Sequence, residues 1–263
     1  MLILVDDMGW MDLSCQGSDY YRTPAIDRLA TEGVRFTNGY AACAVCSPTR
    51  AALQTGRYPH RIGVTDWIRS RFQRGRVGTP AKNPTKYVGG KNSQFLCPPN
   101  PYWMEHEEIS IAEVLKGQGY QSGYIGKWHL GSKRDIVPVE ERGGYDYWLA
   151  ANLLEFCSAA YDCNLWNKDN EKVHLPGYRV DAMTDAVIRY IDDAKKQDKP
   201  FFLFTSYLEP HHQNHVDDYP PPDGYREKYT GKWMPPDLQQ LGGSSGQHLG
   251  GYLGIITRLD EAL

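Results

Sequence analysis

Residues 120–131 read YQSGYIGKWHLG, a stretch that indicates a strand ending in charged side chains. The segment from Tyr120 to Ile125 is predicted to be the strand, and Lys127 and His129 follow just after it. Because Lys127 and His129 are separated by one residue, both side chains point to the same side of an extended segment. The two side chains could bind one anion. The alternative interpretation is an ordinary exposed strand end without a ligand.

Two further predicted strands also end in polar residues. The run Leu2 to Val5 precedes Asp6 and Asp7, and the apolar run 201–204 leads into His211. Helices are predicted between the strands, over 23–33, 109–117 and 178–196, and the second of them is expected to be capped by Ser110 with Glu113 three residues later. This alternation predicts an α/β fold with a mostly parallel central sheet flanked by helices, and a site at the carboxyl edge of that sheet.

The remaining predicted elements are less regular. Extended structure is expected to resume at Val34 to Phe36, a helix follows at Pro48, and a long loop runs from about 63 to 108. A Gly/Ser-rich connector is expected over 242–251, followed by a helix over 252–263. We expect one large domain rather than two.

Carboxylates and histidines at the strand ends are candidate metal ligands. Asp6 and Asp7 are hard oxygen ligands suited to calcium or magnesium, and a solvated turn or helix cap is the alternative. The spacing of His211, His212 and His215 is weak support for a zinc site, and surface placement is the alternative.

The segment Cys46-Ser47-Pro48-Thr49-Arg50 carries the most specific chemical pattern. A buried or disulfide-bonded cysteine is the ordinary interpretation of Cys46, and a surface helix position is the ordinary interpretation of Arg50. The six cysteines are too few for a disulfide framework in a chain of 263 residues, although Cys157 and Cys163 are close enough in sequence to bridge. The redox compartment stays open.

Several of these segments together resemble the type I, formylglycine-dependent sulfatases of the alkaline phosphatase-like superfamily. The likeness lies in Cys-X-Pro-X-Arg at Cys46, the block 126–131, the pair Asp6-Asp7 ahead of 8–10, and the Pro-His segment at His211. It extends from residue 2 to about 263. The resemblance implies the alkaline-phosphatase-like fold, calcium rather than magnesium, and hydrolysis of sulfate monoesters by a formylglycine hydrate made from Cys46 by a formylglycine-generating enzyme.

The resemblance also implies roles for individual residues. Calcium would be bound by Asp6, Asp7 and the modified Cys46, and Arg50 would hold the hydrate. Lys127 and His129 would contact the sulfate and the nucleophile, with His129 helping to expel sulfate after the alcohol has left. His211 would be the acid for the leaving group or a sulfate contact, with His212 as the fallback.

One departure from the family pattern concerns the end of the chain. Sulfatases take further calcium ligands, an Asp with a neighbouring Asn or His, and a second active-site Lys from a region downstream of the helix that here ends at Leu263. We therefore expect residues 1–263 to be the N-terminal part of a sulfatase catalytic domain, incomplete at its C-terminal end and weak or inactive alone.

A basic segment bears on the substrate. No acidic residue occurs between Arg69 and Lys91, and Trp67 and Trp103 flank the segment. It could attract a polyanionic sulfated glycan while the tryptophans stack on sugar rings, and a solvated loop with core tryptophans is the alternative. The basic residues are Arg69, Arg71, Arg74, Arg76, Lys82, Lys86 and Lys91.

Two other functions remain open at this stage. One is a phosphonate monoester hydrolase or phosphodiesterase of the same superfamily, since some of these share Cys-X-Pro-X-Arg. The other is a non-catalytic binder of sulfated glycans. An unmodified Cys46 together with retained affinity for glycans would favour this alternative.

Composition excludes some partners. The formal charge of −3, from 29 basic and 32 acidic residues, provides no overall field that favours nucleic acid. No apolar run approaches the roughly 20 residues needed to span a bilayer. The resemblance implies export to a periplasmic, extracellular or lysosomal space, and the oligomeric state stays open.

Overall fold

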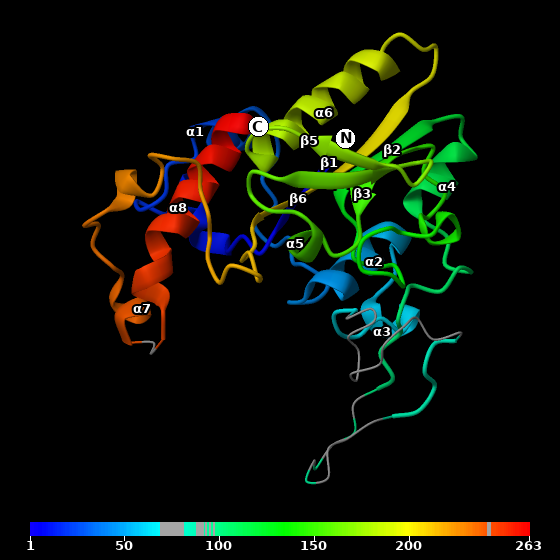
Figure 1. The fold of residues 1–263 in the computed structure, drawn as a ribbon, viewed down its shortest axis with the longest axis horizontal. Coiled ribbons are helices and arrows are strands. Elements are labelled where there is room, and N and C mark those ends of the chain that lie inside the picture. The colour runs from blue at the N-terminus through cyan, green and yellow to red at the C-terminus, as the bar shows by residue number, and fades with distance from the viewer. Residues whose placement is uncertain (69–81, 88–91, 93, 95, 97, 241–242) are drawn as a thin grey trace.

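The computed structural model describes residues 1–68, 82–87, 92, 94, 96, 98–240 and 243–263 (Figure 1). The strands are β1 (Leu2–Asp6), β2 (Gln121–Lys127), β3 (Tyr147–Ala151), β4 (Cys163–Asn167), β5 (Lys172–Leu175) and β6 (Phe201–Pro210). The α-helices are α1 (Pro24–Glu32), α2 (Cys46–Thr55), α3 (Pro59–Ile62), α4 (Ile111–Lys116), α5 (Leu154–Cys157), α6 (Arg179–Ala194), α7 (Pro236–Gln240) and α8 (Ser245–Ala262). Short 3₁₀ turns occur at η1 (Trp10–Asp12), η2 (Ser14–Gln16), η4 (Val139–Glu141) and η5 (Glu227–Tyr229).

The described strands form one sheet in the order β1-β6-β2-β3-β4-β5. The pairs β1/β6, β6/β2 and β2/β3 are parallel, whereas β3/β4 and β4/β5 are antiparallel. The carboxyl ends of β1, β6 and β2 therefore lie side by side at one edge. The predicted α/β class and the mostly parallel central sheet are confirmed.

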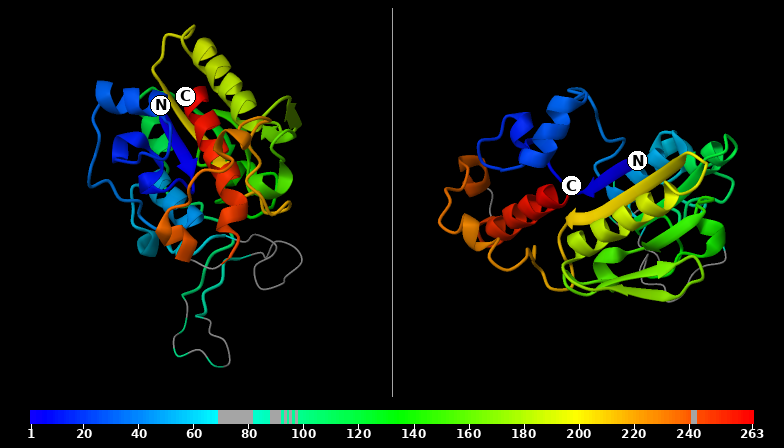
Figure 2. Two further views of the ribbon diagram at one scale, coloured as in Figure 1. Left: turned by 90° about the vertical axis from the view of Figure 1, so that its left-hand side faces the viewer. Right: turned by 90° about the horizontal axis from the view of Figure 1, so that it is seen from above.

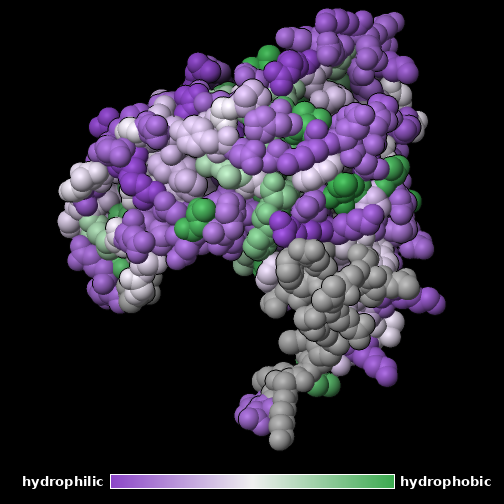
Figure 3. All heavy atoms as spheres, in the orientation of Figure 1, coloured by the Kyte–Doolittle hydropathy of each residue, from purple (hydrophilic) through white to green (hydrophobic). Residues whose placement is uncertain are grey.

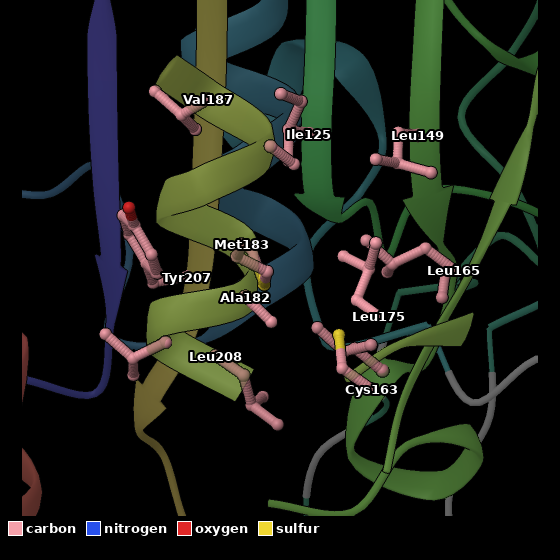
Figure 4. Close-up of a cluster of buried hydrophobic side chains, with 14 of the residues drawn as sticks. Ile125, Leu149, Cys163, Leu165, Leu175, Ala182, Met183, Val187, Tyr207 and Leu208 are labelled. Atoms are coloured by element: carbon pink, nitrogen blue, oxygen red, sulfur yellow. The ribbon is translucent and has the colours of Figure 1, made fainter. Parts of the chain in front are cut away.

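Alternate residues of the central strands supply two separate cores, one on each face of the sheet. Ile125 and Leu203 face α6, and Figure 4 shows Met183 and Val187 of α6 in the same cluster as Ile125. The opposite face carries Tyr124, which shares a cluster with side chains of α2, α3 and α4. Burial on both faces explains why successive residues of one strand, such as Leu203 and Phe204, are both apolar.

Helix α6 covers its face through one apolar stripe. Its buried residues Val180, Met183, Val187, Tyr190 and Ala194 recur at spacings of three or four, which places them on one side of the helix. Figure 2 shows α6 running alongside β6. The face of the molecule seen in Figure 3 is largely hydrophilic, with only scattered apolar spots.

The helix near the end of the chain begins earlier than predicted. Helix α8 starts at Ser245, inside the segment 242–251 that was expected to be a connector. A Cβ on Gly251 would lie 2.3 Å from the carbonyl oxygen of Tyr219, and one on Gly254 would lie 2.9 Å from Pro221. Because glycine has no side chain, these two positions let the 219–221 segment approach the helix closely. This packing is why the helix extends through them.

Two other predictions from local sequence patterns, the cap of α4 and the segment from Val34 to Phe36, had different outcomes. The predicted cap of α4 is confirmed, since the Ser110 side chain accepts a hydrogen bond from the backbone N–H of Glu113 and the Glu113 carboxylate accepts one from Ser110. The extended segment predicted at Val34 to Phe36 is not a strand of the sheet. Val34 and Phe36 are exposed and pair with none of the named strands, so the apolar pattern there has no sheet neighbour.

Gly126, at the end of β2, is a position where only glycine fits. Its φ is +111°, and an added Cβ would lie 2.0 Å from the carbonyl oxygen of Ser206 on the neighbouring strand β6. We expect Gly126→Ala to lower the free energy of unfolding by roughly 3 kcal/mol, because left-handed strain and a backbone overlap act together. Urea denaturation followed by circular dichroism would measure the loss.

Gly177 provides the matched control for Gly126. It also has a positive φ, +92°, but an added Cβ would meet no atom of the described residues within 4 Å. Gly177→Ala should therefore cost only the conformational strain, about 1 kcal/mol. Equal losses at the two positions would show that the approach of Ser206 does not restrict Gly126.

Candidate active site

Ionisable side chains from four elements meet at the carboxyl edge of the sheet. Asp6 ends β1, Lys127 ends β2, Cys46 begins α2, and Glu155 lies on α5 just after β3. Strand β6, between β1 and β2, leads directly into His211. Parallel pairing brings these ends together although the residues are far apart in the chain.

A buried ion cluster is built around Asp6. Its Oδ2 lies 2.8 Å from Lys127 Nζ and 3.3 Å from Arg50 Nη2, and the side chains of all three residues are almost completely buried. Burial alone would raise the pKa of Asp6, but Lys127 and Arg50 hold it well below its usual range. Asp6 is therefore ionised, and both cations keep their charge.

Arg50 is oriented by the strand ends. Its Nη1 donates to the carbonyl oxygen of Lys127 and to the hydroxyl of Ser206, each at 2.6 Å. The remaining donors, Nε and Nη2, are buried without a hydrogen-bond partner within the described part of the chain, although Nη2 faces Asp6. Arg50 thus belongs to the interior rather than to a helix surface, with donor capacity left over.

Glu155 is a member of this cluster that sequence reasoning did not identify. Its Oε2 lies 3.2 Å from Lys127 Nζ, and its side chain is buried. Burial raises the pKa of Glu155, but the charge of Lys127 brings it below its ordinary value. A lone Glu between Leu154 and Phe156 carries no motif, so the sequence offered no signal for its position.

His129 is held as a neutral imidazole with a defined tautomer. Its Nε2 lies 2.8 Å from the carbonyl oxygen of Ile68, so Nε2 carries the proton and donates it. Its Nδ1 is then an acceptor, and it is buried without a hydrogen-bond partner among the described residues. Burial and, next, the charge of Lys127 lower the pKa of His129 to about 3.

The depressed pKa of His129 makes stability depend on pH. Between its ordinary value of 6.5 and about 3, the unfolded chain binds a proton that the native chain does not, so stability is lost as the pH falls through this range. Between pH 6.5 and 4, we expect this residue to contribute a slope of up to about 1.4 kcal/mol per pH unit. Urea denaturation at several pH values should show a shallower slope for His129→Gln, and an unchanged slope for His60→Gln, where the side chain is exposed. Identical slopes for His129→Gln and the parent chain would contradict a buried neutral imidazole.

Cys46 stands at the first position of α2 among these charges. Burial raises the pKa of its thiol, and the effects of Lys127 and Arg50 are opposed by those of Asp6 and Glu155. The thiol is therefore protonated and is not poised to act as a thiolate nucleophile. It is a free cysteine, as are Cys157 and Cys163, so the two latter residues do not form the bridge that their spacing allowed.

Asp7 and His211 lie on the solvent side of the cluster. Asp7 has a φ of +63° and a side chain that is 58% exposed, and His211 Nε2 lies 3.6 Å from its Oδ2. His211 Nδ1 donates to the carbonyl oxygen of His212 at 2.6 Å. His212 itself faces Asp217, at 3.2 Å, rather than Asp7.

The described side chains supply only part of a metal-binding site. Within the described ranges, no group of three or more His, Cys, Asp or Glu side chains is arranged to hold one. His211, His212 and His215 thus do not form the zinc site that their spacing weakly supported. Calcium takes six to eight oxygens, and Asp6 and Asp7 supply only part of such a shell.

The basic segment proposed to attract a glycan lies mostly outside the described residues. Arg69, Arg71, Arg74, Arg76 and Lys91 are among those not described, whereas Lys82 and Lys86 are described and exposed. Trp67 is half-buried, and its ring lies edge-on to His129 with the centroids 6.3 Å apart. Trp103 is also half-buried, beside His106.

These features place the chain among α/β proteins whose functional groups gather at the carboxyl edge of a parallel sheet. The sequence model of the family described as Sulfatase matches residues 1–263. The chain is 31% identical over 268 residues to an ulvan-active sulfatase from Formosa agariphila, covering 99% of this chain and 44% of that protein. The chain therefore belongs to the sulfatase family.

Two further similarities agree with this assignment. An N-acetylgalactosamine-6-sulfatase from Sus scrofa is 37% identical over 179 residues, which cover 68% of this chain and 28% of that protein. The crystal structure of the yidJ protein of Bacteroides fragilis, assigned as a sulfatase, superposes with a TM-score of 0.78 at 26% identity, covering 99% of this chain and 56% of that one. The fold is alkaline-phosphatase-like. The chain spans less than half the length of these two curated relatives.

Proposed function

We propose that the protein hydrolyses sulfate monoesters of a sulfated carbohydrate through a formylglycine made from Cys46. The observation that carries the proposal is the position of Cys46, at the start of α2 and within electrostatic reach of the buried Lys127 and Arg50. A protonated thiol in that place is a poor nucleophile, whereas the oxygens of an aldehyde hydrate and of the substrate could be contacted by the side chains of Lys127 and Arg50.

The other side chains have properties that suit the remaining steps. Arg50 keeps buried donors that have no hydrogen-bond partner among the described residues, which favours contact with an anionic oxygen. Neutral His129 offers an acceptor at Nδ1, which could take the proton of the second hydroxyl of the hydrate while the aldehyde C=O bond re-forms and the C–O bond to the sulfate breaks. His211, on the solvent side, is our candidate for protonating the departing alcohol, and His212 is the fallback.

We propose calcium as the metal, with Asp6, Asp7 and the modified Cys46 as the ligands from this part of the protein. When bound, such an ion would supply charge stabilisation at the sulfuryl oxygens. Residues 1–263 would form the N-terminal part of the catalytic domain, with the rest of the calcium shell contributed from outside it, and they would be weak or inactive alone.

The substrate class rests on the relatives and on one contact. Two relatives carry names that refer to carbohydrates, ulvan and N-acetylgalactosamine. Trp67, beside His129, presents an aromatic surface on which a sugar ring could stack. We also propose export from the cytoplasm, as the family resemblance implies. Within the described residues, no helix is both long and apolar enough to cross a bilayer.

The first test is mass spectrometry of the peptide that contains Cys46, after coexpression with a formylglycine-generating enzyme. We expect the loss of mass that corresponds to conversion of the thiol to the aldehyde, followed by turnover of sulfate esters by the complete gene product. Faster turnover of phosphonate or phosphate esters would favour the related hydrolases. An unmodified thiol, with a control substrate converted, would favour a glycan-binding role.

A further inference from the structure

The cluster at the carboxyl edge has an unusual balance of charge. Its buried cations are Lys127 and Arg50, and its buried anions are Asp6 and Glu155. These four side chains carry two positive and two negative charges, and each cation lies within 3.3 Å of a carboxylate. An anion that enters beside Lys127 therefore meets an interior in which each cation is already offset.

The two carboxylates differ in their partners. Asp6 faces both cations, whereas Glu155 faces Lys127 alone, and its Oε2 has no hydrogen-bond partner within the described ranges. Of the two, Glu155 is the less compensated charge. Its field is therefore the one that an anion bound at Lys127 would feel most directly.

Glu155 is also held in place by the backbone around it. Gln213 Nε2 donates to the carbonyl oxygens of Glu155, at 2.7 Å, and of Ser158, at 3.0 Å. Gln213 in turn accepts from Arg179, which forms a buried ion pair with Glu209 on β6. Because α5 is tied to the end of β6 in this way, we expect the carboxylate to stay beside Lys127 when a ligand binds.

We propose that Glu155 determines specificity for the charge of the bound anion, acting through Lys127 and favouring singly charged sulfate esters over doubly charged anions. The proposal rests on the proposed function. Near neutral pH a sulfate monoester is singly charged, whereas its product, inorganic sulfate, and the competing phosphate monoesters are mainly doubly charged. A fixed carboxylate repels a doubly charged anion twice as strongly as a singly charged one. Glu155 therefore aids release of inorganic sulfate and excludes phosphate monoesters. A bound metal ion would strengthen the binding of both classes and would leave the sign of this effect unchanged.

The experiment measures two affinities in the complete gene product carrying Cys46→Ala, so that no ester is consumed. Calorimetric titration with methyl sulfate and with inorganic sulfate gives the ratio of the two dissociation constants. Adding Glu155→Gln should lower the dissociation constant of methyl sulfate by about tenfold and that of inorganic sulfate by about a hundredfold. The ratio of the two constants should therefore shift by about tenfold. A role limited to packing would weaken both ions or change neither.

Control variants separate charge from shape. Glu155→Asp keeps the charge and should keep the parent ratio, while Glu155→Met is a second uncharged variant and should shift the ratio as Glu155→Gln does. Asp146→Asn removes a carboxylate just before β3, at the opposite edge of the sheet, where it pairs with Lys116, and it should leave both affinities unchanged. Because both constants come from one preparation, the ratio does not depend on the fraction of folded protein.

The outcomes distinguish the two levels of the proposal. The sulfate site itself would be overturned if the parent protein bound neither ion, or if Lys127→Met left both affinities unchanged. Binding by the parent with an unchanged ratio in Glu155→Gln and Glu155→Met would overturn only the role of Glu155.

Discussion

Replacing Cys46 by alanine is expected to reduce hydrolysis of a sulfate ester by the complete gene product by about 10⁴-fold or more, the usual cost of removing a nucleophile. The side chain is only partly accessible and begins α2, so its loss removes few packing contacts. The buried ion cluster of Asp6, Arg50 and Lys127 would remain. We therefore expect the melting temperature to stay close to that of the parent while turnover, followed by sulfate release, disappears.

Cys43 is the matched control for this experiment. It is also a free, partly buried cysteine and lies three residues before Cys46, outside the helix. Cys43→Ala should retain turnover within about twofold, since Cys43 is not a member of the ion cluster formed by Asp6, Arg50, Lys127 and Glu155. Equal turnover by the parent protein and by Cys46→Ala would refute nucleophilic catalysis at this position.

Replacing Lys127 by methionine is expected to have the largest effect on stability. Lys127 Nζ lies between two buried carboxylates, 2.8 Å from Asp6 and 3.2 Å from Glu155. Methionine fills much of the same volume but leaves Glu155 without an ion partner and Asp6 with Arg50 alone. Breaking a buried pair in this way costs about 3–5 kcal/mol of unfolding free energy. Denaturation in urea measures the loss, and the sulfate ester assay should show turnover lowered by at least about a hundredfold.

A second substitution tests the cause of that loss. Glu155→Gln, added to Lys127→Met, should recover part of the stability because the unpaired carboxylate becomes neutral. Lys116→Met breaks an exposed ion pair with Asp146 and should cost less than about 1 kcal/mol. If Lys127→Met were no more destabilising than Lys116→Met, the buried cluster would not be an important electrostatic element of the fold.

Local patterns in the sequence carried enough information for the sheet and for several members of the site. Apolar runs ending in Asp6, Lys127 and His211 predicted neighbouring strand ends, because parallel strands present their carboxyl ends at one edge. The cap of α4 was predictable from Ser110 and Glu113, since both partners lie within one helical turn. These signals share a short range along the chain.

Contacts between distant residues lay beyond that range. The first turn of α1 is capped by Asp260 of α8, which accepts from the backbone N–H of Ala25 at 3.1 Å and of Ile26 at 2.8 Å. Helix α8 could begin at Ser245 because its glycines pack against the 219–221 segment. A pattern of residues in one segment does not specify which distant backbone will approach it.

The sequence by itself determined the α/β class, the family and the identity of the groups that end each strand. The tertiary structure alone decided the electrostatic state of the site. It buried Arg50 against Ser206, placed Glu155 beside Lys127 and kept His129 neutral. The physical reason is that a charge at a buried site depends on desolvation and on its partners, and both are set only when separate segments pack together.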